Sequence, residues 1–540
     1  MSKPFAITLK PGTSLTNLTG TWRTERPVYL NRLPPCNNAC PAGENIQGWL
    51  FHAESGDYEQ AWRVLTLDNP LPAVMGRVCY HPCENACNRG QLDSSVGINS
   101  VERFLGDEAI KQGWKFAAPA VATGKRVLVV GAGPSGLSAA YHLARIGHQV
   151  EIHEAGPLAG GMMRFGIPKY RLPREVLDAE VARICELGVT LKLNTKVENI
   201  EQSMKDGGFD AAFLAVGAHI GKRAMIPAGD AAHIVDAVSV LRSMENEDKP
   251  MLGRRVVVYG GGNTAVDVAR TVKRMGAEPI IVYRRTRDKA PAHDFEIEEA
   301  LQEGVMIKWL STIKQAGDSS ITIEKMELDD KGFPQPTGEY ETLEADSVVL
   351  ALGQDVDLSL LEGVSGLEVK AGTVQVAANM MTGHPGIFAG GDMVPSERTV
   401  TVAVGHGKKA ARHIDAYLRG TRYDPAPKPE LAEYGKLNPW YYSDADKTVR
   451  PMLDLIRRQT SFDEVQGGLD ENTALFEARR CLSCGNCFEC DNCYGVCPDN
   501  AVIKLGPGKG FQFNYDYCKG CGLCVAECPC GAIKMVAEET

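Results

Sequence analysis

The last sixty or so residues of the chain contain two copies of the cysteine pattern C-x2-C-x2-C-x3-C-P. The first copy consists of Cys487, Cys490, Cys493 and Cys497, and the second of Cys518, Cys521, Cys524 and Cys528. This spacing is typical of a pair of [4Fe-4S] clusters, in which the fourth cysteine of each copy ligates the other cluster. A zinc ribbon would instead require two C-x2-C pairs. The pattern therefore predicts that this end of the chain handles electrons one at a time.

Three more cysteines lie beside these two copies and have no place in them. Cys481 and Cys484 precede the first copy, and Cys530 follows the second. Because Cys481, Cys484 and Cys487 also read C-x2-C-x2-C, the register of the first copy is ambiguous, and we favour the register that ends in the Cys-Pro pair. The three extra thiols are then either structural or ligands of a further centre, and the spacing does not decide between these alternatives.

A second group of cysteines lies near the N-terminus, in the segments PPCNNACPAG and GRVCYHPCENACNRG. Its members are Cys36, Cys40, Cys79, Cys83 and Cys87. Between the two segments, residues 46–67 place Trp, Leu and Ala at roughly helical spacing, which predicts amphipathic helix. We predict one [4Fe-4S] cluster for this group, because four thiolates suffice and five are available. A zinc site is the alternative.

Residues 124–155 combine an apolar strand, the glycine-rich turn GAGPSG, a helix and a second strand that ends in Glu154. The first glycine of such a turn permits a tight bend, the second lets the backbone approach a pyrophosphate, and the third lets helix and strand pack closely. The helix N-terminus faces the anion, and the acidic residue suits the ribose hydroxyls. This segment therefore predicts a dinucleotide site made by Gly131, Gly133, Pro134, Ser135, Gly136 and Glu154.

A second glycine-rich turn, GGGNTA, also lies between a strand and a helix, with Ala as an accepted variant in the third position. The next strand ends in Tyr-Arg-Arg, where the first fingerprint has an acidic residue. Arginine at this place accommodates the 2′-phosphate of NADP(H), so NADP(H) is favoured over NAD(H) unless the two arginines are an ordinary solvated pair. The predicted contacts are Gly260, Gly262, Asn263, Thr264, Ala265, Arg284 and Arg285.

Two further segments, GGM after the first fingerprint and IFAGGD much later in the chain, indicate which dinucleotide the first turn binds. They resemble the FAD fingerprint of flavoproteins with two dinucleotide-binding domains. The resemblance implies that FAD is the cofactor and that Asp392 hydrogen-bonds the ribityl chain of the flavin. It also implies that the helix after IFAGGD points its N-terminus toward the flavin pyrimidine. The residues concerned are Gly160, Gly161, Met162, Gly391 and Asp392.

Three N-terminal stretches, PPCNNACPAGENIQGWL, DNPLPAVMGRVCYHPCENAC and GINSVERFLGD, resemble the helical domain of the NADPH-dependent glutamate synthase small subunit. Dihydropyrimidine dehydrogenase has a related domain. That family has two more cysteines ahead of the position of Cys36, and they are missing here, so one of its two clusters is expected to be absent. The resemblance implies that the surviving cluster uses Cys40, Cys79 and Cys83, and it leaves the fourth ligand open between Cys36, Cys87 and Glu102.

Together these features predict an α/β protein with two Rossmann-like dinucleotide-binding domains, an N-terminal α-helical Fe-S domain and a C-terminal α+β domain like a bacterial ferredoxin. The FAD domain is discontinuous and the NAD(P) domain is inserted in it, because FAD motifs flank the second fingerprint on both sides. The predicted boundaries are 1–120 for the helical domain, 121–240 and 371–425 for the FAD domain, 241–370 for the NAD(P) domain, 426–475 for a linker and 476–540 for the ferredoxin-like domain.

The bulk properties narrow the class of function. The chain has 540 residues and a net charge of −10. We find no basic stretch suited to nucleic acid, and we expect no secretory leader and no membrane span. Of the 17 cysteines only Cys185 lies outside the two terminal groups, so the redox-active cysteine pair of a disulfide reductase is missing. Cysteine-rich ends without an export signal indicate metal sites in the cytoplasm.

The combination predicts an electron-transfer oxidoreductase in which FAD exchanges hydride with NAD(P)(H) and [4Fe-4S] clusters pass single electrons to or from a partner. No substrate domain is left over, so we expect the partner to be another subunit, as in a 2-oxoacid:acceptor oxidoreductase, or a ferredoxin. The alternative is a glutamate synthase small subunit that supplies a large amidotransferase subunit. We also expect the N-terminal cluster to lie near the FAD and the C-terminal domain to face the partner.

Overall fold

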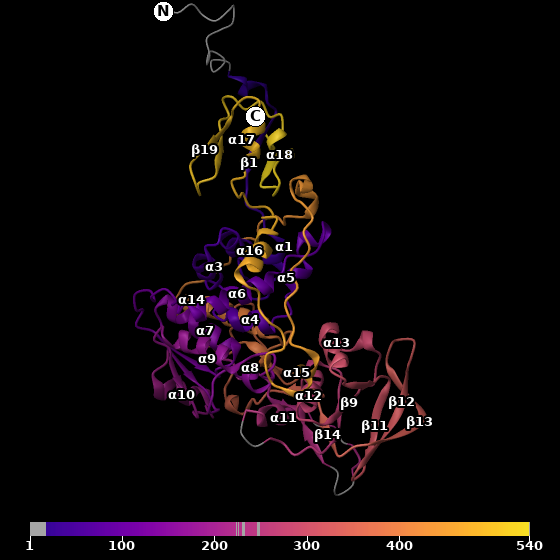
Figure 1. The fold of residues 1–540 in the computed structure, drawn as a ribbon. Coiled ribbons are helices and arrows are strands. Elements are labelled where there is room, and N and C mark those ends of the chain that lie inside the picture. Colours follow the sequence, from indigo (N-terminus) through magenta and orange to yellow (C-terminus); the bar gives the residue numbers. More distant parts are fainter. Residues whose placement is uncertain (1–17, 223, 225, 229–232, 246–248, 539–540) are drawn as a thin grey trace, which may run out of the picture.

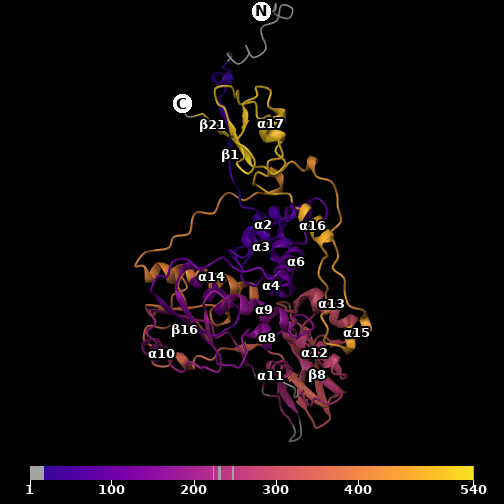
Figure 2. The same cartoon turned by 60° about the vertical axis from the view of Figure 1, so that its left-hand side comes forward.

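The structure, a computed structural model, describes residues 18–222, 224, 226–228, 233–245 and 249–538. The described chain forms four regions along one long axis (Figure 1). Two α/β regions lie side by side at one end, a bundle of short helices lies between, and the C-terminal cysteine-rich region forms the other end. The segment after α14 runs up to the base of the C-terminal region and returns along the outside of the bundle to the α/β regions (Figure 2).

The first α/β region contains a five-stranded parallel sheet in the order β18-β5-β2-β3-β4. Its strands are β2 (Arg126–Val130), β3 (Gln149–His153), β4 (Thr190–Lys192), β5 (Ala211–Leu214) and β18 (Ile387–Ala389). β2 and β5 are almost entirely buried apolar runs, as expected for parallel strands covered on both faces. The helices of this region are α7 (Pro134–Ile146), α8 (Met162–Phe165), α9 (Arg174–Cys185), α10 (Ile200–Gly207) and α14 (Val400–Leu418).

The second α/β region contains another five-stranded parallel sheet, in the order β10-β9-β8-β14-β7. Its strands are β7 (Ile234–Asp236), β8 (Arg255–Tyr259), β9 (Glu278–Val282), β10 (Met306–Lys308) and β14 (Ser347–Leu350). Its helices are α11 (Ala237–Ser243), α12 (Asn263–Arg274) and α13 (Asp294–Gln302), and an antiparallel sheet is added by β11 (Ser311–Ala316), β12 (Ser320–Leu328) and β13 (Pro334–Glu344). Because β5 and β18 of the first sheet flank this region in the chain, the first region is discontinuous and the second is inserted in it.

The helical bundle consists mainly of residues from the N-terminal third of the chain. Its helices are α1 (Pro35–Ala39), α2 (Ile46–Ala53), α3 (Tyr58–Leu65), α4 (Pro72–Val78), α5 (Pro82–Asn85) and α6 (Ile98–Lys111). α4 and α6 cross closely, since a Cβ on Gly76 would lie only 2.4 Å from Cα of Arg103. A late helix, α16 (Glu471–Arg479), also belongs to the bundle, because its Ala474 and Ala478 share the core with Trp49. The predicted start of the C-terminal domain at residue 476 therefore falls inside a helix of the bundle.

The C-terminal region contains α17 (Asn492–Val496), α18 (Leu523–Ala526), the hairpin β19 (Val502–Lys504) with β20 (Phe511–Phe513), and β21 (Ile533–Ala537). β21 pairs antiparallel with β1 (Glu25–Tyr29), so the first described strand of the chain completes the last region. The ring of Tyr29 stacks on Phe513 with centroids 4.5 Å apart, which anchors the strand.

Among the residues that the structure describes, no helix combines the length and the apolar character needed to cross a membrane.

Candidate functional site

The first glycine-rich turn joins β2 to α7 and depends on glycine at two positions. Gly131 has φ 102°, and a Cβ there would lie 2.5 Å from the carbonyl O of Ala215. A Cβ on Gly136 would lie 2.0 Å from the carbonyl O of Gly131, so any side chain would force the helix from the strand. Gly133 is less crowded, with Cα of Gly161 as the nearest atom at 3.9 Å. The turn therefore leaves room beside Gly133 for an anion at the N-terminus of α7, which begins with Pro134.

Glu154 and the Gly160-Gly161 pair close around this turn. The carboxylate of Glu154, just after β3, accepts a hydrogen bond from the backbone N–H of Ala132 at 2.8 Å. The backbone N–H of Gly160 donates to the carbonyl O of Ala132, also at 2.8 Å. Gly161 has φ 52°, and a Cβ there would lie 2.8 Å from Cα of Gly133. Met162 follows as the first residue of α8, so the predicted FAD residues up to this point surround one turn.

The late IFAGGD motif, which follows β18, lies beside the same turn. Gly391 has φ 71°, and a Cβ there would lie 3.1 Å from Cβ of Ser135. The hydroxyl of Ser135 is buried and has no hydrogen-bond partner among the described residues. Burial raises the pKa of Asp392 to about 6, although Arg398 opposes the shift. A buried hydroxyl without a partner and a desolvated carboxyl group both indicate a polar ligand here, and the set fits FAD.

The second glycine-rich turn joins β8 to α12 and repeats this geometry. Gly260 has φ 150°, and a Cβ there would lie 2.3 Å from the carbonyl O of Ala351. A Cβ on Gly262 would meet no atom within 4 Å, so this position is open to a ligand. The first turn of α12 is formed by Asn263, Thr264 and the buried Ala265. The turn is therefore shaped for a second pyrophosphate.

Arg284 and Arg285 follow β9, at the edge of this second site. Arg284 is exposed and Arg285 is half-buried. In the described part of the chain neither forms an ion pair with an acidic side chain, and the Nε of Arg285 has no hydrogen-bond partner. The ring of Tyr283 lies against the turn, where a Cβ on Gly261 would meet it at 2.4 Å. Two guanidinium groups without carboxylate partners suit a phosphate group.

Cys40, Cys79 and Cys83 form one group with Glu102 in the helical bundle. Burial raises the pKa of the Cys79 thiol to about 12, and the nearby Glu102 carboxylate adds to the shift. Burial also raises the pKa of Cys83, together with the thiols of Cys79 and Cys40. The buried carboxylate of Glu102 accepts a hydrogen bond from the Asn69 side chain at 2.9 Å, which orients it. Of the three residues that the sequence left open as a fourth ligand, the structure brings Glu102 to these thiols.

This thiol group lies directly against α14, the helix that follows IFAGGD. The hydroxyl of Thr401, in the first turn of α14, donates a hydrogen bond to Sγ of Cys79 at 3.1 Å. Further along the helix, a Cβ on Gly405 would lie 2.2 Å from the carbonyl O of Pro41, so the bundle packs on α14 without a gap. The expected proximity of an N-terminal thiol group to the FAD region agrees with these contacts. Sequence reasoning did not identify Thr401.

Tyr80 connects the same loop to the second dinucleotide turn. Its hydroxyl accepts a hydrogen bond from the Asn263 side chain at 2.7 Å, and its ring stacks on His293 with centroids 3.8 Å apart. Tyr80 lies between Cys79 and Cys83 in the chain, so one loop contacts both α/β regions. Nothing in the sequence pattern pointed to Tyr80, because its role depends on how the bundle packs on α12.

Cys36 and Cys87, two of the three residues left open as the fourth ligand of the N-terminal cluster, lie in a different group from Cys40, Cys79 and Cys83. They line a cavity together with Cys481 and Cys484 from the other end of the chain. Cys36 and Cys40, at the two ends of α1, have different neighbours, because Cys36 lines this cavity whereas Glu102 and Cys79 lie near Cys40. The C-x2-C spacing of Cys481 and Cys484 was visible in the sequence, but no spacing rule could connect it to residues so far upstream.

The C-terminal thiols exchange their fourth members between the two copies, as the spacing predicts. One cavity is lined by Cys497 of the first copy and by Cys518, Cys521 and Cys524 of the second. The pKa of Cys493 is raised to about 11, first by burial and then by the thiols of Cys487, Cys528 and Cys490, while a hydrogen bond with Tyr29 lowers it. Sγ of the buried Cys530 lies 3.7 Å from Sγ of Cys528.

In none of the groups do the side chains converge on a single point. Within the residues that the structure describes, no three His, Cys, Asp or Glu side chains lie close enough together to hold one metal ion. Two of the thiol groups instead line cavities, one with Cys497, Cys518, Cys521 and Cys524 and one with Cys36, Cys87, Cys481 and Cys484. This arrangement fits a cluster of several irons, each with its own thiolate, and provides the donor set that [4Fe-4S] clusters use.

Two glycine-rich turns in adjoining Rossmann-like regions, with thiol groups leading away from them, define a pyridine-nucleotide-dependent flavoprotein with iron-sulfur centres. Residues 125–407 match the pyridine nucleotide-disulphide oxidoreductase family, and the chain belongs to that family. Residues 24–114 match dihydropyrimidine dehydrogenase domain II with its 4Fe-4S cluster, and residues 486–532 match the 4Fe-4S dicluster domain. The chain is therefore an electron-transfer oxidoreductase that binds FAD, NAD(P) and [4Fe-4S] clusters, which confirms the predicted class.

Several curated proteins resemble the chain over most of its length. The beta subunit of NADP(+)-dependent formate dehydrogenase from Moorella thermoacetica is 37% identical over 500 residues, covering 83% of this chain and 70% of that protein. The beta subunit of NADPH-Fe(3+) oxidoreductase from Geobacter sulfurreducens is 32% identical over 506 residues, covering 83% and 75%. The small chain of NADPH glutamate synthase from Escherichia coli is 32% identical over 424 residues, covering 71% and 89%.

Proposed function

We propose that the chain is the NADP(H)-reactive subunit of a multisubunit oxidoreductase, with its flavin at the Gly131 turn and its partner at the C-terminal region. The observation that carries this proposal is the hydrogen bond from Thr401 to Cys79, because it ties the thiol groups to the flavin region. When bound, FAD supplies hydride exchange with the nicotinamide, and the [4Fe-4S] clusters supply one-electron transfer. The bundle that carries the N-terminal thiols lies between the α/β regions and the C-terminal region (Figure 1).

The proposed roles of the flavin-binding residues follow from their positions. The turn at Gly133 and the N-terminus of α7 would hold the pyrophosphate, and the free hydroxyl of Ser135 would donate to it. Glu154 keeps lone pairs for ribose hydroxyls beyond the two that the backbone N–H groups of Ala132 and Gly156 use. Asp392 would accept a hydrogen bond from the ribityl chain, as the family resemblance implies.

We also propose which side chains hold the clusters predicted from the sequence. In the bundle they are Cys40, Cys79 and Cys83 with Glu102. At the C-terminal end, the two sets are Cys487, Cys490, Cys493 and Cys528, and Cys518, Cys521, Cys524 and Cys497. The cavity lined by Cys497, Cys518, Cys521 and Cys524 supports the last set, and the neighbouring thiols of Cys83 and Cys493 support the other two.

NADP(H) rather than NAD(H) is the proposed nucleotide. Arg284 and Arg285 present guanidinium groups at the end of β9 that no acidic side chain of the described residues neutralises. A 2′-phosphate at this edge would supply the missing charge, whereas NAD(H) would leave both groups unpaired. The names of the Moorella and Geobacter relatives contain NADP(+) and NADPH, which supports the same choice.

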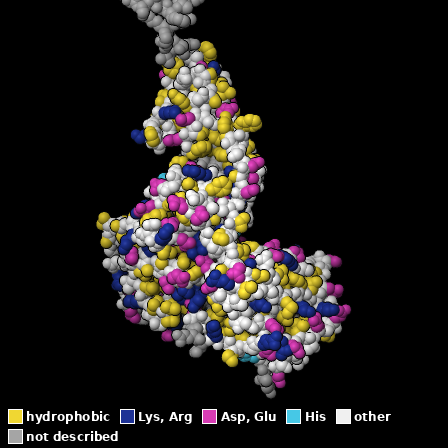
Figure 3. Space-filling model, in the orientation of Figure 1, with side chains coloured by type: hydrophobic (Ala, Val, Ile, Leu, Met, Phe, Trp, Pro, Cys, Tyr) yellow, Lys and Arg dark blue, Asp and Glu magenta, His cyan; other side chains and the backbone are white. Residues whose placement is uncertain are grey.

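The proposed partner is an oxidoreductase subunit with a redox centre of its own, of which formate dehydrogenases and 2-oxoacid:acceptor oxidoreductases are examples. Two relatives are named as beta subunits of oxidoreductases and match 83% of the chain, against 71% for the glutamate synthase small chain. The C-terminal end also has hydrophobic side chains on its surface (Figure 3). Leu523, next to Cys524, is 44% exposed, and Tyr494, next to Cys493, is 47% exposed.

We place the protein in the cytoplasm. Cys487, Cys490 and Cys521 are exposed, and a reducing compartment keeps such thiols from forming disulfides before a cluster is assembled.

The test is to purify the tagged full chain anaerobically from its native host and to identify its stoichiometric partners. We expect an oxidoreductase subunit that contains its own redox cofactor, and bleaching of the flavin absorbance by NADPH in preference to NADH. A large amidotransferase subunit in the complex would favour the glutamate synthase alternative. No bleaching by either nucleotide would overturn the proposal.

A further inference from the structure

We propose that a further [4Fe-4S] cluster is held by four thiols from opposite ends of the chain, Cys36, Cys87, Cys481 and Cys484. The sequence predicted that one N-terminal cluster is absent, because two upstream cysteines are missing. Neither of the two iron-sulfur domain matches contains all four cysteines. The match over residues 24–114 contains Cys36 and Cys87 but not the other two, and the match over residues 486–532 begins after Cys484. The site exists only when the two ends fold together.

The four thiols line one cavity in the bundle. Apolar side chains such as Leu50, Val96 and Ile98 form much of the remaining wall. Four thiols on one cavity provide the soft donor set that iron and zinc centres use, and a bound metal centre supplies the positive charge that keeps thiolates together in apolar surroundings. The donor set is therefore that of a metal centre rather than of four independent structural thiols.

The local geometry explains why each pair of N-terminal cysteines is divided between two sites. Cys36 lies in the first turn of α1 and Cys40 is the C-cap of the same helix. Cys83 lies within α5, and Cys87 is the N-cap of the following helical turn at Asn88–Gln91. In each pair one thiol lines this cavity and the other lies in the Glu102 group, so each C-x3-C pair is shared between two sites.

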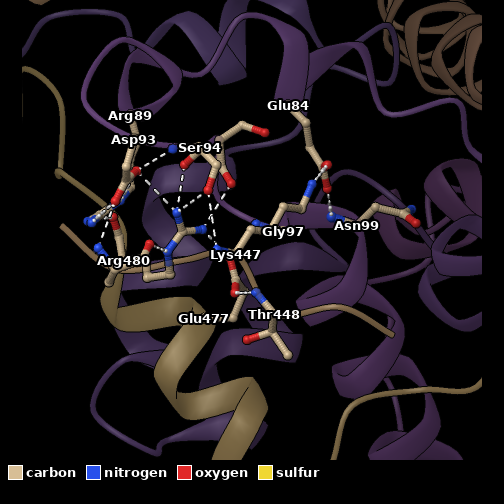
Figure 4. A network of polar contacts seen from close by, with 12 residues as sticks. Glu84, Arg89, Asp93, Ser94, Gly97, Asn99, Lys447, Thr448, Glu477 and Arg480 are labelled. Carbon is tan, nitrogen blue, oxygen red and sulfur yellow. Dashed lines mark hydrogen bonds and ion pairs between the residues drawn. The ribbon is translucent and has the colours of Figure 1, made fainter. Parts of the chain in front are cut away.

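A buried polar network holds the segment with Cys481 against the bundle (Figure 4). Arg480 is 2% exposed and Glu477 is 0% exposed, and they form an ion pair at 2.6 Å. The guanidinium of Arg480 donates to the carbonyl O of Ser94 at 2.6 Å, and the side chain of Arg89 donates to the carbonyl O of Arg480 at 2.8 Å. The carboxylate of Glu477 accepts from the backbone N–H of Gly97 at 2.6 Å. The residue before Cys481 is thus fixed on both its side chain and its backbone.

N–H groups are directed at the two late thiols. The backbone N–H of Ser483 donates to Sγ of Cys481 at 3.4 Å. The side-chain amide of Asn88, next to Cys87, donates to Sγ of Cys484 at 3.4 Å. Such donors stabilise thiolates and help to set the potential of a cluster. They come from both ends of the chain, so the cavity is assembled as one site.

The position of the cavity gives the cluster a place in the electron route. Cys484 is followed three residues later by Cys487, which belongs to the C-terminal groups. The backbone N–H of Gly485, the residue after Cys484, donates to the carbonyl O of Cys530 at 2.6 Å, so the cavity segment contacts the C-terminal region directly. On the other side, α1 connects the cavity to Cys40 of the Glu102 group. The proposed site therefore lies between the thiol group near the flavin and the pair at the C-terminal end.

The experiment is a metal count on the full chain, expressed and purified anaerobically and normalised to FAD. Four [4Fe-4S] clusters give about 16 irons per FAD, and three give about 12. In Cys481→Ser/Cys484→Ser we expect a loss of about one quarter of the iron and of one EPR signal of the reduced protein, with FAD retained. Cys185→Ser, which removes the isolated thiol at the end of α9, is the matched control and should keep all of the iron.

A second double variant, Cys36→Ser/Cys87→Ser, reaches the same site from the N-terminal side and should lose the same signal. If either double variant loses FAD as well, the iron content of the wild-type protein still distinguishes four clusters from three. About 12 irons per FAD in the wild type would overturn the proposal. Unchanged iron in a soluble double variant, or one zinc per chain that disappears with Cys481 and Cys484, would also overturn it. Iron, zinc and EPR measurements do not depend on the nucleotide or the partner. They therefore test the cluster separately from the proposed function.

Discussion

The C-terminal region and the helical bundle each bring together two groups of four candidate ligands, but they assemble them differently. At the C-terminal end, each group takes three thiols from one short loop and the fourth from the other copy. In the bundle, α1 gives Cys36 to one group and Cys40 to the other. The two groups are completed by a carboxylate, Glu102, and by two thiols that follow α16. Spacing therefore specifies the ligands where one loop supplies most of them, and packing specifies them where each element serves two sites.

The two regions also differ in how far their thiols are from solvent. Cys487, Cys490 and Cys521 at the C-terminal end are exposed, whereas none of the five N-terminal cysteines is. Exposed ligands suit transfer across an interface to a partner. Thiols enclosed by the bundle suit transfer within the chain, where water and oxidants have little access.

The largest effect is expected from Glu102, the one candidate ligand in either region that is not a thiol. Glu102→Ala removes the oxygen ligand from the group with Cys40, Cys79 and Cys83, and we expect about four fewer irons per FAD. Transfer of electrons from NADPH to the C-terminal clusters should then stop, while NADPH still bleaches the flavin. Metal analysis and EPR of the NADPH-reduced protein measure both effects.

Glu102→Gln is the matched variant for this comparison. It keeps an oxygen at the same place and should retain most of the iron. Full iron content in Glu102→Ala would show that the carboxylate is not a ligand, and the group would then have only three ligands from the protein.

Arg480→Ala should have the next largest effect, and only in the bundle. It leaves the fully buried carboxylate of Glu477 without its cation, and breaking a buried pair in this way costs about 3–5 kcal/mol. We expect faster hydrogen exchange in α16 and proteolytic cleavage near Cys481, with the C-terminal region unchanged. Arg479→Ala, one residue earlier and exposed, is the control and should behave like the wild type. Equal protection of α16 from hydrogen exchange in Arg480→Ala and Arg479→Ala would contradict the structural role of Arg480.

The contrast between ligands specified by spacing and ligands specified by packing also explains how much could be predicted from the sequence. The two Rossmann-like turns and the exchange of Cys497 and Cys528 follow from local motifs, whose glycines and cysteines act over a few residues. The partition of Cys36 and Cys40, the pairing of β1 with β21 and the role of Arg480 depend on contacts between residues hundreds of positions apart. Such contacts have no local periodicity or spacing that identifies them. Thr401 is a similar case, because a threonine in the first turn of a helix is usually a solvated residue or a cap.

A smaller effect is expected at the nucleotide site, where Arg284 and Arg285 lie outside both thiol regions. In Arg284→Gln/Arg285→Gln the loss of charge-assisted hydrogen bonds of about 1.5–3 kcal/mol should raise KM for NADPH by about 10- to 100-fold. KM for NADH should hardly change. Arg287→Gln is the control, because Arg287 lies near Asp294 and Glu298. Steady-state reduction of a dye with both nucleotides separates these outcomes, and an equal rise for NADH would contradict the assignment of the 2′-phosphate site.

The smallest effect is expected at the contact that joins the flavin region to the bundle. Thr401→Val removes the hydroxyl that donates to Sγ of Cys79 at 3.1 Å, and Thr401→Ser keeps it. A hydrogen bond to a cluster thiolate stabilises the more negative reduced state, so its loss should lower the reduction potential of the nearby cluster. A net bond of about 0.5–1.5 kcal/mol corresponds to about 20–60 mV for one electron. A redox titration followed by EPR should show this shift in one signal only, with iron and FAD contents unchanged. If the potential is the same in the Val and Ser variants, the sulfur of Cys79 is not a ligand, and the route from the flavin region must enter the bundle elsewhere.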